Sequence, residues 1–189
     1  MAVVARIEGF AIVSEDGMLA DADGAMPASL QAPADQRFFE AGLNRADIVV
    51  HGRHSQEHQE KSHERWRLRV SRGVPALALD PANPRALVWN PAGASLEAAI
   101  AELGLRDASI GVIGATGVFG LFLDRYDAFY LTRGPRVRLP GGRPVFPGVP
   151  AQSPEDLLAE YGMQCAQRQV LDASADLRVA HWRRNASNA

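Results

Sequence analysis

The eight residues Ile48-Val49-Val50-His51-Gly52-Arg53-His54-Ser55 combine a short apolar run with a tight turn and the start of a helix. The apolar run is typical of a short central strand. Glycine allows a ligand to approach the backbone, the first turn of a helix offers free N–H groups, and Arg53 is a forked donor for phosphate oxygens. The stretch therefore predicts a phosphate-binding turn at the end of a strand, with a plain tight turn and a solvated arginine as the alternative.

A second strand-to-helix turn of the same kind follows later in the chain, at Val112-Ile113-Gly114-Ala115-Thr116-Gly117-Val118-Phe119-Gly120. Open α/β sheets place pyrophosphate groups at glycine-rich turns of this type. The stretch lacks the Gly-x-Gly-x-x-Gly pattern of dinucleotide-binding folds, and no Lys-Ser/Thr pair follows it as in a P-loop. Close packing of the helix against the strand explains the glycines equally well.

Short apolar runs separated by glycine, proline and charged residues recur along the chain. They predict strands at 7–13, 48–50, 68–71, 76–79, 86–89, 109–113 and 128–133, and a terminal hairpin formed by 164–171 and 177–182. Helices are expected to begin at Pro33, after the N-cap Ser95 and after the turn at 114–117, the last running through Leu123, whereas 134–154 is expected to be loop. This alternation predicts an α/β protein with a mostly parallel central sheet and an antiparallel C-terminal edge, in one domain over residues 1–189.

Composition narrows the class of protein. The chain has 189 residues, of which 47% are hydrophobic and 22% charged, as in ordinary globular proteins. A net charge of -2 gives no basis for nucleic-acid binding, and no apolar run approaches the ~20 residues that span a bilayer. The single cysteine, Cys165, cannot form an internal disulfide, and no leader pattern precedes Phe10. We therefore expect a cytoplasmic protein that acts on a small molecule, without nucleic-acid or membrane partners, and a homodimer remains open.

Asp35 is the first candidate for a catalytic acid, because it lies in the first turn of the helix that Pro33 opens. An acid at that position is ordinarily a favourable partner of the helix dipole. If it faces inward, it could hold a protonated, nitrogen-rich ring and tune a nearby proton transfer.

Four histidines, His51, His54, His58 and His63, lie close together in the sequence, and His54 and His58 have the i, i+4 spacing of helical metal ligands. The acids around them are scattered and the region is very polar. We therefore expect a solvated face and no metal site.

The order of these segments resembles that of the dihydrofolate reductase family. The resemblance extends from about Ile7 to Pro147 and rests on segments that follow one another as in that family: 16–20 with 24–27, 33–39, 49–55, 70–72, 112–119, 130–132 and Phe146-Pro147. It implies a three-layer dihydrofolate reductase-like fold and hydride transfer from NADPH to dihydrofolate or a related pterin, with the cofactor supplying the chemistry.

The resemblance also assigns roles to individual residues. Asp35 would hold the pterin, Thr132 would hydrogen-bond that acid, and Met26 would gate water, while Ile12, Phe39 and Arg65 would contact substrate, Arg65 at the folate tail. NADPH would be held by Gly52, Arg53, His54, Ser55, Ser71, Arg72, Gly114, Ala115, Thr116, Gly117, Val118 and Phe119.

Several departures from the family bear on the substrate. Ala28 stands where the family has a tryptophan that closes the pocket, Gln36 replaces an apolar residue beside the acid, and the preceding loop is longer by about two residues. Ala115 interrupts a Gly-Gly pair that carries a cis peptide bond in the family. Either the cis bond is kept before Ala115, or the turn is rebuilt. Residues 14–20 also resemble the reductase domain of riboflavin biosynthesis. A reductase of another heterocycle and a non-catalytic nucleotide-binding protein therefore stay as alternatives.

Overall fold

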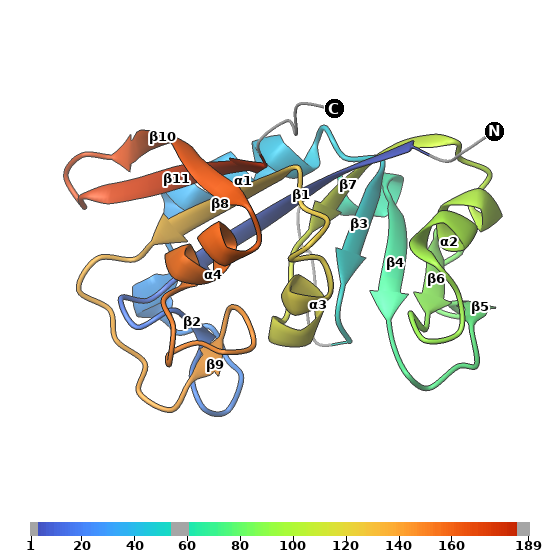
Figure 1. The fold of residues 1–189 in the computed structure, drawn as a ribbon, viewed down its shortest axis with the longest axis horizontal. Helices are drawn as coiled ribbons and strands as arrows, with labels where there is room; N and C mark the ends of the chain where they lie inside the picture. The colour runs from blue at the N-terminus through green and yellow to red at the C-terminus, as the bar shows by residue number, and fades with distance from the viewer. Residues whose placement is uncertain (1–3, 54–60, 185–189) are drawn as a thin grey trace.

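The computed structural model describes residues 4–53 and 61–184, and its centre is a nine-stranded sheet in the order β10-β11-β8-β1-β7-β3-β4-β6-β5 (Figure 1). The six inner strands, from β8 to β6 in that order, run parallel. They are β1 (Val4–Val13), β3 (Ile48–His51), β4 (Trp66–Val70), β6 (Ala86–Trp89), β7 (Asp107–Val112) and β8 (Ala128–Arg133). The predicted hairpin forms the antiparallel edge, as β10 (Met163–Asp172) and β11 (Leu177–Arg184).

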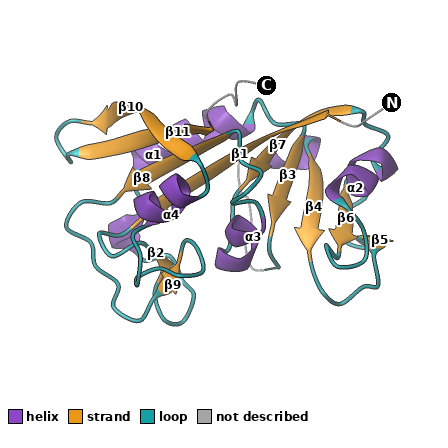
Figure 2. Cartoon of the chain, viewed as in Figure 1, coloured by secondary structure: helices purple, strands orange, loops and turns teal. Residues whose placement is uncertain are grey.

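Helices cover both faces of this sheet, which gives the three layers that the resemblance implies. Helix α1 (Pro33–Leu43) lies behind the sheet in Figures 1 and 2, and α2 (Leu96–Glu102), α3 (Thr116–Leu121) and α4 (Pro154–Glu160) lie in front. Two short 3-10 turns, η1 (Ala28–Leu30) and η2 (Ser62–Glu64), complete the helical segments that are described. The predicted α/β class with its mostly parallel sheet is confirmed. Within 4–53 and 61–184, no helix is long and apolar enough to span a bilayer.

The helix boundaries follow from local chemistry that the sequence displays. Pro33 occupies the first turn of α1, where a missing N–H costs little. The Ser95 hydroxyl accepts the backbone N–H of Ala98 at 3.1 Å and caps α2. Gly104 ends that segment in the left-handed conformation, with φ of +74°.

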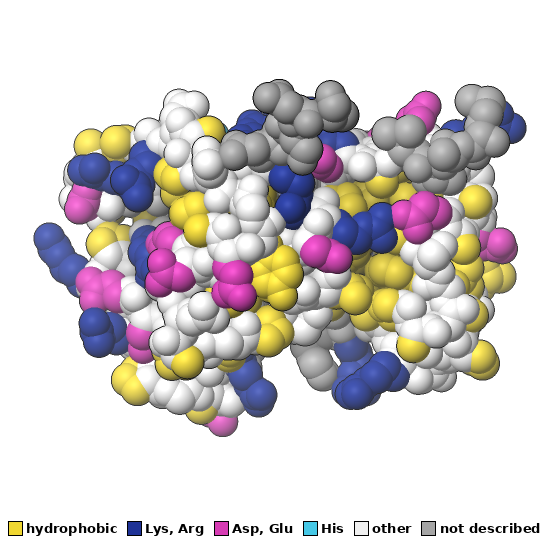
Figure 3. All heavy atoms as spheres, in the orientation of Figure 1, with side chains coloured by type: hydrophobic (Ala, Val, Ile, Leu, Met, Phe, Trp, Pro, Cys, Tyr) yellow, Lys and Arg dark blue, Asp and Glu magenta, His cyan; other side chains and the backbone are white. Residues whose placement is uncertain are grey.

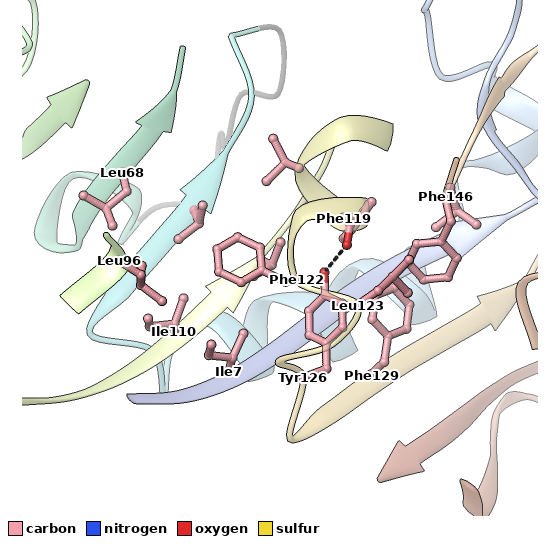
Figure 4. Close-up of a cluster of buried hydrophobic side chains, with 14 of the residues drawn as sticks. Ile7, Leu68, Leu96, Ile110, Phe119, Phe122, Leu123, Tyr126, Phe129 and Phe146 are labelled. Atoms are coloured by element: carbon pink, nitrogen blue, oxygen red, sulfur yellow. Dashed lines mark hydrogen bonds between the residues drawn. The ribbon is translucent and has the colours of Figure 1, made fainter. Parts of the chain in front are cut away.

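Buried aromatic side chains dominate the core on the α2, α3 and α4 side of the sheet. Phe119, Phe122, Tyr126, Phe129 and Phe146 are each at most 1% exposed and pack edge to face or tilted against one another (Figure 4). The Tyr126 hydroxyl donates to the Phe119 carbonyl at 3.1 Å, so its polar atom is paired inside the core. This cluster fixes α3, and with it the turn that precedes α3, against the sheet.

The surface is mixed in character. On the face seen in Figure 3, basic and acidic side chains are interspersed with apolar ones. This distribution agrees with the small net charge of -2.

The structure corrects the sequence-based expectation in four places. The segment expected to be loop contains β9 (Arg143–Pro144), which pairs with β2 (Met18–Ala20) in a separate small sheet. Helix α4 was not predicted, although Ser153 caps it by accepting the Asp156 N–H at 3.0 Å and Pro154 opens it. Strand β5 (Leu77–Leu79) makes the second edge of the large sheet antiparallel as well. Helix α3 ends at Leu121, two residues before the predicted end.

Candidate active site

Three strand-end turns meet along one edge of the sheet. Strand β3 lies between β7 and β4 and runs parallel to both, so the turns that follow these three strands are neighbours. The turns begin at Gly52, Ser71 and Ile113. The Gly52 N–H donates to the Gly114 carbonyl at 2.7 Å, which joins the first turn directly to the third. Ligands of open parallel sheets bind beyond the carboxyl ends of the strands, which is the edge formed here.

The backbone of these turns is closely fitted. A Cβ atom on Gly52 would lie 3.4 Å from the Ala115 nitrogen, which is van der Waals contact with the neighbouring turn. The Gly114–Ala115 peptide bond is cis. Of the two alternatives, a kept cis bond or a rebuilt turn, the structure has the cis bond. Gly114 has a φ of +113°, which few other residues adopt. Gly117 faces open space, with no atom within 4 Å of the position its Cβ would occupy.

Two exposed arginines flank the turns. Neither Arg53 nor Arg72 makes a hydrogen bond or ion pair within the part of the chain that is described, so both guanidinium groups are available to an anion. The Ser71 hydroxyl accepts the Gly73 N–H at 3.1 Å. Of the other predicted cofactor residues, Thr116 donates its hydroxyl to the Pro144 carbonyl, and Val118 and Phe119 are buried. His54 and Ser55 lie outside the described residues.

A cavity of about 920 Å³ opens beside the third turn, between α1, β1, β8 and the loop that follows β2. Five residues with predicted catalytic or substrate roles line it together: Ile12, Met26, Asp35, Phe39 and Thr132. Ala115 and Phe119 of the third turn line it as well, so the candidate cofactor edge and the Asp35 site share one continuous space. Met26, at the mouth, is 42% exposed.

Asp35 is the one charged residue among the described residues that line this cavity. Burial among apolar groups raises the pKa of its carboxyl above the ordinary 3.8, while a hydrogen bond with the Thr132 side chain acts in the opposite direction. Thr132 itself is 1% exposed and belongs to β8, so it lines the cavity from the sheet. The pair can carry a proton or accept hydrogen bonds from a ring N–H group.

Aromatic rings form the wall beside Asp35. Phe10 and Tyr130 are stacked with centroids 4.9 Å apart, and Phe38 and Phe39 meet them edge to face at 5.5 and 6.3 Å. All four rings line the cavity. Flat apolar walls with one acid at the end suit a planar heterocycle with polar nitrogens.

Comparison with known proteins gives matches at the level of structure. No family model matches the chain, and no curated protein matches it by sequence. A riboflavin biosynthesis protein from Shewanella sp. PV-4 superposes with a TM-score of 0.65 at 20% identity, over 95% of this chain and 99% of the other. The dihydrofolate reductase of Enterococcus faecalis, complexed with NADP(H) and RAB-propyl, gives 0.62 at 16% identity, over 95% of this chain and 96% of the other. This chain has the dihydrofolate reductase fold.

A third protein shares the fold as part of a longer chain. It is the diaminohydroxyphosphoribosylaminopyrimidine deaminase/5-amino-6-(5-phosphoribosylamino)uracil reductase of Thermotoga maritima, with a TM-score of 0.65 at 17% identity. The match covers 96% of this chain and 57% of the Thermotoga protein. The TM-scores of 0.62–0.65 establish the common dihydrofolate reductase fold. Because the identities are only 16–20%, the chemistry has to be argued from the residues of this chain.

Of the three predicted substrate residues, Ile12 and Phe39 line the Asp35 cavity and Arg65 lies outside it. Arg65 is 7% exposed and donates to the side-chain oxygen of Asn44. It lies instead in a polar surface hollow of about 390 Å³ shared with Lys61, Trp66 and Arg85.

Sequence reasoning missed Phe10 and Tyr130 as parts of the cavity wall, although the sequence holds a usable signal for both. Side chains two apart on a strand share a face, so Phe10 accompanies Ile12 on β1, and Tyr130 accompanies Thr132 on β8. The parallel register pairs Phe10 with Tyr130 and Ile12 with Thr132, which brings the four side chains to one place. Of the four neighbouring histidines, His54 and His58 lie outside the described residues. Within 4–53 and 61–184, no three potential metal ligands gather.

Proposed function

We propose that this chain is an NADPH-dependent reductase that delivers a hydride to dihydrofolate or a related pterin. The observation that carries the proposal is the shared cavity, which has aromatic walls and is lined both by Asp35 and by Ala115 of the third turn. A planar ring held at Asp35 and a nicotinamide held at the turn would then lie next to each other, as hydride transfer requires.

The residues at the sheet edge fit a phosphorylated cofactor. Arg53 and Arg72 would bind its phosphates, with Ser71, and the Gly52 and Gly114–Gly117 backbones would let it approach closely. His54 and Ser55 belong to the same proposal. When bound, NADPH supplies the hydride, and the protein supplies position and electrostatics.

Asp35 would act on the ring that receives the hydride. A carboxylate beside a ring nitrogen raises the proton affinity of that nitrogen, and protonation makes the ring a better hydride acceptor. Thr132 would keep the carboxyl oriented, and Met26 at the mouth would help to exclude water from the reacting groups.

The decisive assay is the loss of NADPH absorbance on addition of dihydrofolate, run beside NADH, Asp35→Asn and the exposed control Asp124→Asn. We expect oxidation that prefers NADPH, that falls by about a hundredfold or more in kcat for Asp35→Asn, and that is unchanged in Asp124→Asn. Arg53→Ala and Arg72→Ala should reduce the preference for NADPH over NADH. Full activity of Asp35→Asn would refute the role of this acid.

A second candidate is reduction of another heterocycle, as in riboflavin biosynthesis. It is favoured by Ala28 and Gln36, which both line the cavity where the family resemblance led us to expect a tryptophan and an apolar residue. The uracil compound that the Thermotoga reductase acts on is the substrate to test in the same assay. Tight NADPH binding without oxidation by any ring would leave a nucleotide-binding protein that lacks turnover.

A further inference from the structure

The outward face of α1 carries polar side chains in a row that leads from the Asp35 cavity to Arg65. Gln36, Glu40 and Asn44 follow one another at intervals of four residues, so they lie on one side of the helix. Gln36 lines the cavity at its rim and is exposed, while Arg65 lies outside the cavity. We call Gln36, Glu40 and Asn44 the polar ladder.

The members of the ladder are bonded in sequence. The Gln36 side-chain amide donates to the Glu40 carboxylate at 3.1 Å, and Arg65 donates to the side-chain oxygen of Asn44. Burial lowers the pKa of Arg65, the nearby Arg67 lowers it further, and the charge of Glu40 opposes both effects. Glu40 is therefore close enough to act on Arg65 as well as on Gln36.

This arrangement places a negative charge between the cavity and Arg65. A substrate tail that runs from Asp35 along α1 would pass Gln36 and then meet the Glu40 carboxylate. A carboxylate on that tail would be repelled there, and the Arg65 guanidinium beyond already donates to the side-chain oxygen of Asn44. A neutral, hydroxylated tail would instead find an amide and a carboxylate able to form hydrogen bonds with it.

We infer that the polar ladder makes this cavity select heterocycles whose tail carries no negative charge, and that Glu40 is the specificity-determining residue. The inference rests on the proposed reductase function and narrows its substrate to pterin-like rings with neutral tails. Selection of this kind works by placing a like charge against the wrong substrate as well as by contacts to the right one.

The test compares two dihydropterins, dihydrofolate with its glutamate tail and dihydrobiopterin with a neutral hydroxylated tail. Their kcat/KM values with NADPH, and their affinities by calorimetry, would be measured for the wild type, Glu40→Gln and the control Glu102→Gln on α2. We expect the wild type to prefer dihydrobiopterin. Glu40→Gln should improve kcat/KM for dihydrofolate by about two- to fivefold, the range for an exposed charge pair, without a matching gain for dihydrobiopterin, whereas Glu102→Gln should leave both values at the wild-type level.

Salt gives a second measurement that needs no variant. Because repulsion is screened by ions, dihydrofolate should bind the wild type more tightly at high ionic strength than at low, and Glu40→Gln should lose this dependence. The inference is overturned if kcat/KM is equal for the two substrates in the wild type. It is also overturned if the ratio of the two kcat/KM values is the same in Glu40→Gln as in the wild type. Either result leaves the proposed reductase function standing. Failure of every ring to bind or to oxidise NADPH overturns the proposed function, and this inference with it.

Discussion

Gly42 on α1 offers a quantitative test of how the wall of the cavity is packed. A Cβ atom added at Gly42 would lie 2.3 Å from Cε1 and 2.7 Å from Cζ of Phe10, far inside contact distance. The Phe10 ring has little room to retreat, because it is stacked on Tyr130 with centroids 4.9 Å apart and touches Phe39 edge to face. Gly42→Ala would therefore force the cavity wall or the helix to move.

Two opposing terms set the size of the effect. Alanine in a helix interior is favoured over glycine by about 1 kcal/mol. Overpacking a filled site costs about 1–3 kcal/mol, and the short distances at Phe10 place this substitution in the upper part of that range. We expect a net loss of about 1–2 kcal/mol in the free energy of unfolding, measured by urea denaturation.

The control for Gly42→Ala is Gly117→Ala in α3, where no atom lies within 4 Å of the added Cβ. We expect this variant to be as stable as the wild type or slightly more stable, and to bind NADPH more weakly because its methyl group enters the proposed cofactor space. In Gly42→Ala the displaced Phe10 ring should instead raise KM for the heterocycle more than for NADPH. Wild-type or greater stability of Gly42→Ala would refute the packing argument.

Three further predictions concern ionisation, an ion pair and a helix cap. Burial raises the pKa of the Asp35 carboxyl above 3.8, so this carboxyl ionises at a lower pH in the unfolded chain than in the folded one. The free energy of unfolding, relative to that of Asp35→Asn, should therefore fall as the pH rises from 3.8 through the raised pKa, measured by urea denaturation. Arg133 bonds both carboxylate oxygens of Glu155, at 2.8 and 2.5 Å, and a double-mutant cycle on unfolding should give a coupling of about 1–2 kcal/mol. Ser95→Ala should lose about 1 kcal/mol of stability with an unchanged NADPH affinity.

An exposed pair on the terminal hairpin is the matched control for the Arg133–Glu155 cycle. Arg178 and Asp176 lie 3.0 Å apart with side chains 61% and 67% exposed, against 33% and 30% for Arg133 and Glu155. Solvent screens the outer pair, so its coupling should be below about 0.5 kcal/mol. Equal couplings for the two pairs would contradict the role of partial burial.

Much of the fold could be predicted from the sequence because its strands are short, apolar and separated by strong turn residues. Runs such as Ile48–Val50 and Ala128–Arg133 match the strands closely. Strand β9 has two residues and β2 has three, too few for a periodic pattern, and they pair only because distant segments meet. Helix α4 differs from these, since the Ser-Pro-Glu-Asp start at residues 153–156 is a local signal that could have been used.

Candidate site residues could be predicted where the residue type itself suggests the chemistry. Their surroundings could not be predicted, because these depend on contacts between distant segments. Asp35 and Thr132 follow from the family resemblance, and the structure brings them together in one cavity. Arg65 follows from the same resemblance, but its surroundings do not. Its bond to Asn44 and its proximity to Glu40 depend on how the end of α1 faces the start of β4, which the sequence does not display.

The proposed function assigns the cofactor, the substrate ring and the substrate tail to different elements of this fold. The edge at which we propose that the cofactor binds is formed by the turns at the ends of β3, β4 and β7, where backbone N–H groups, glycines and two arginines would receive its phosphates. The ring site draws its acid from α1 and its floor from the register of β1 with β8. The tail of a substrate, by contrast, would pass the outer face of α1 in the proposal made above, where the charge of Glu40 would favour one class of tail over another. Under the proposed function, Glu40 would therefore tell more about the substrate than Asp35, because an acid at Asp35 suits any protonatable ring, whereas Glu40 would discriminate among their tails.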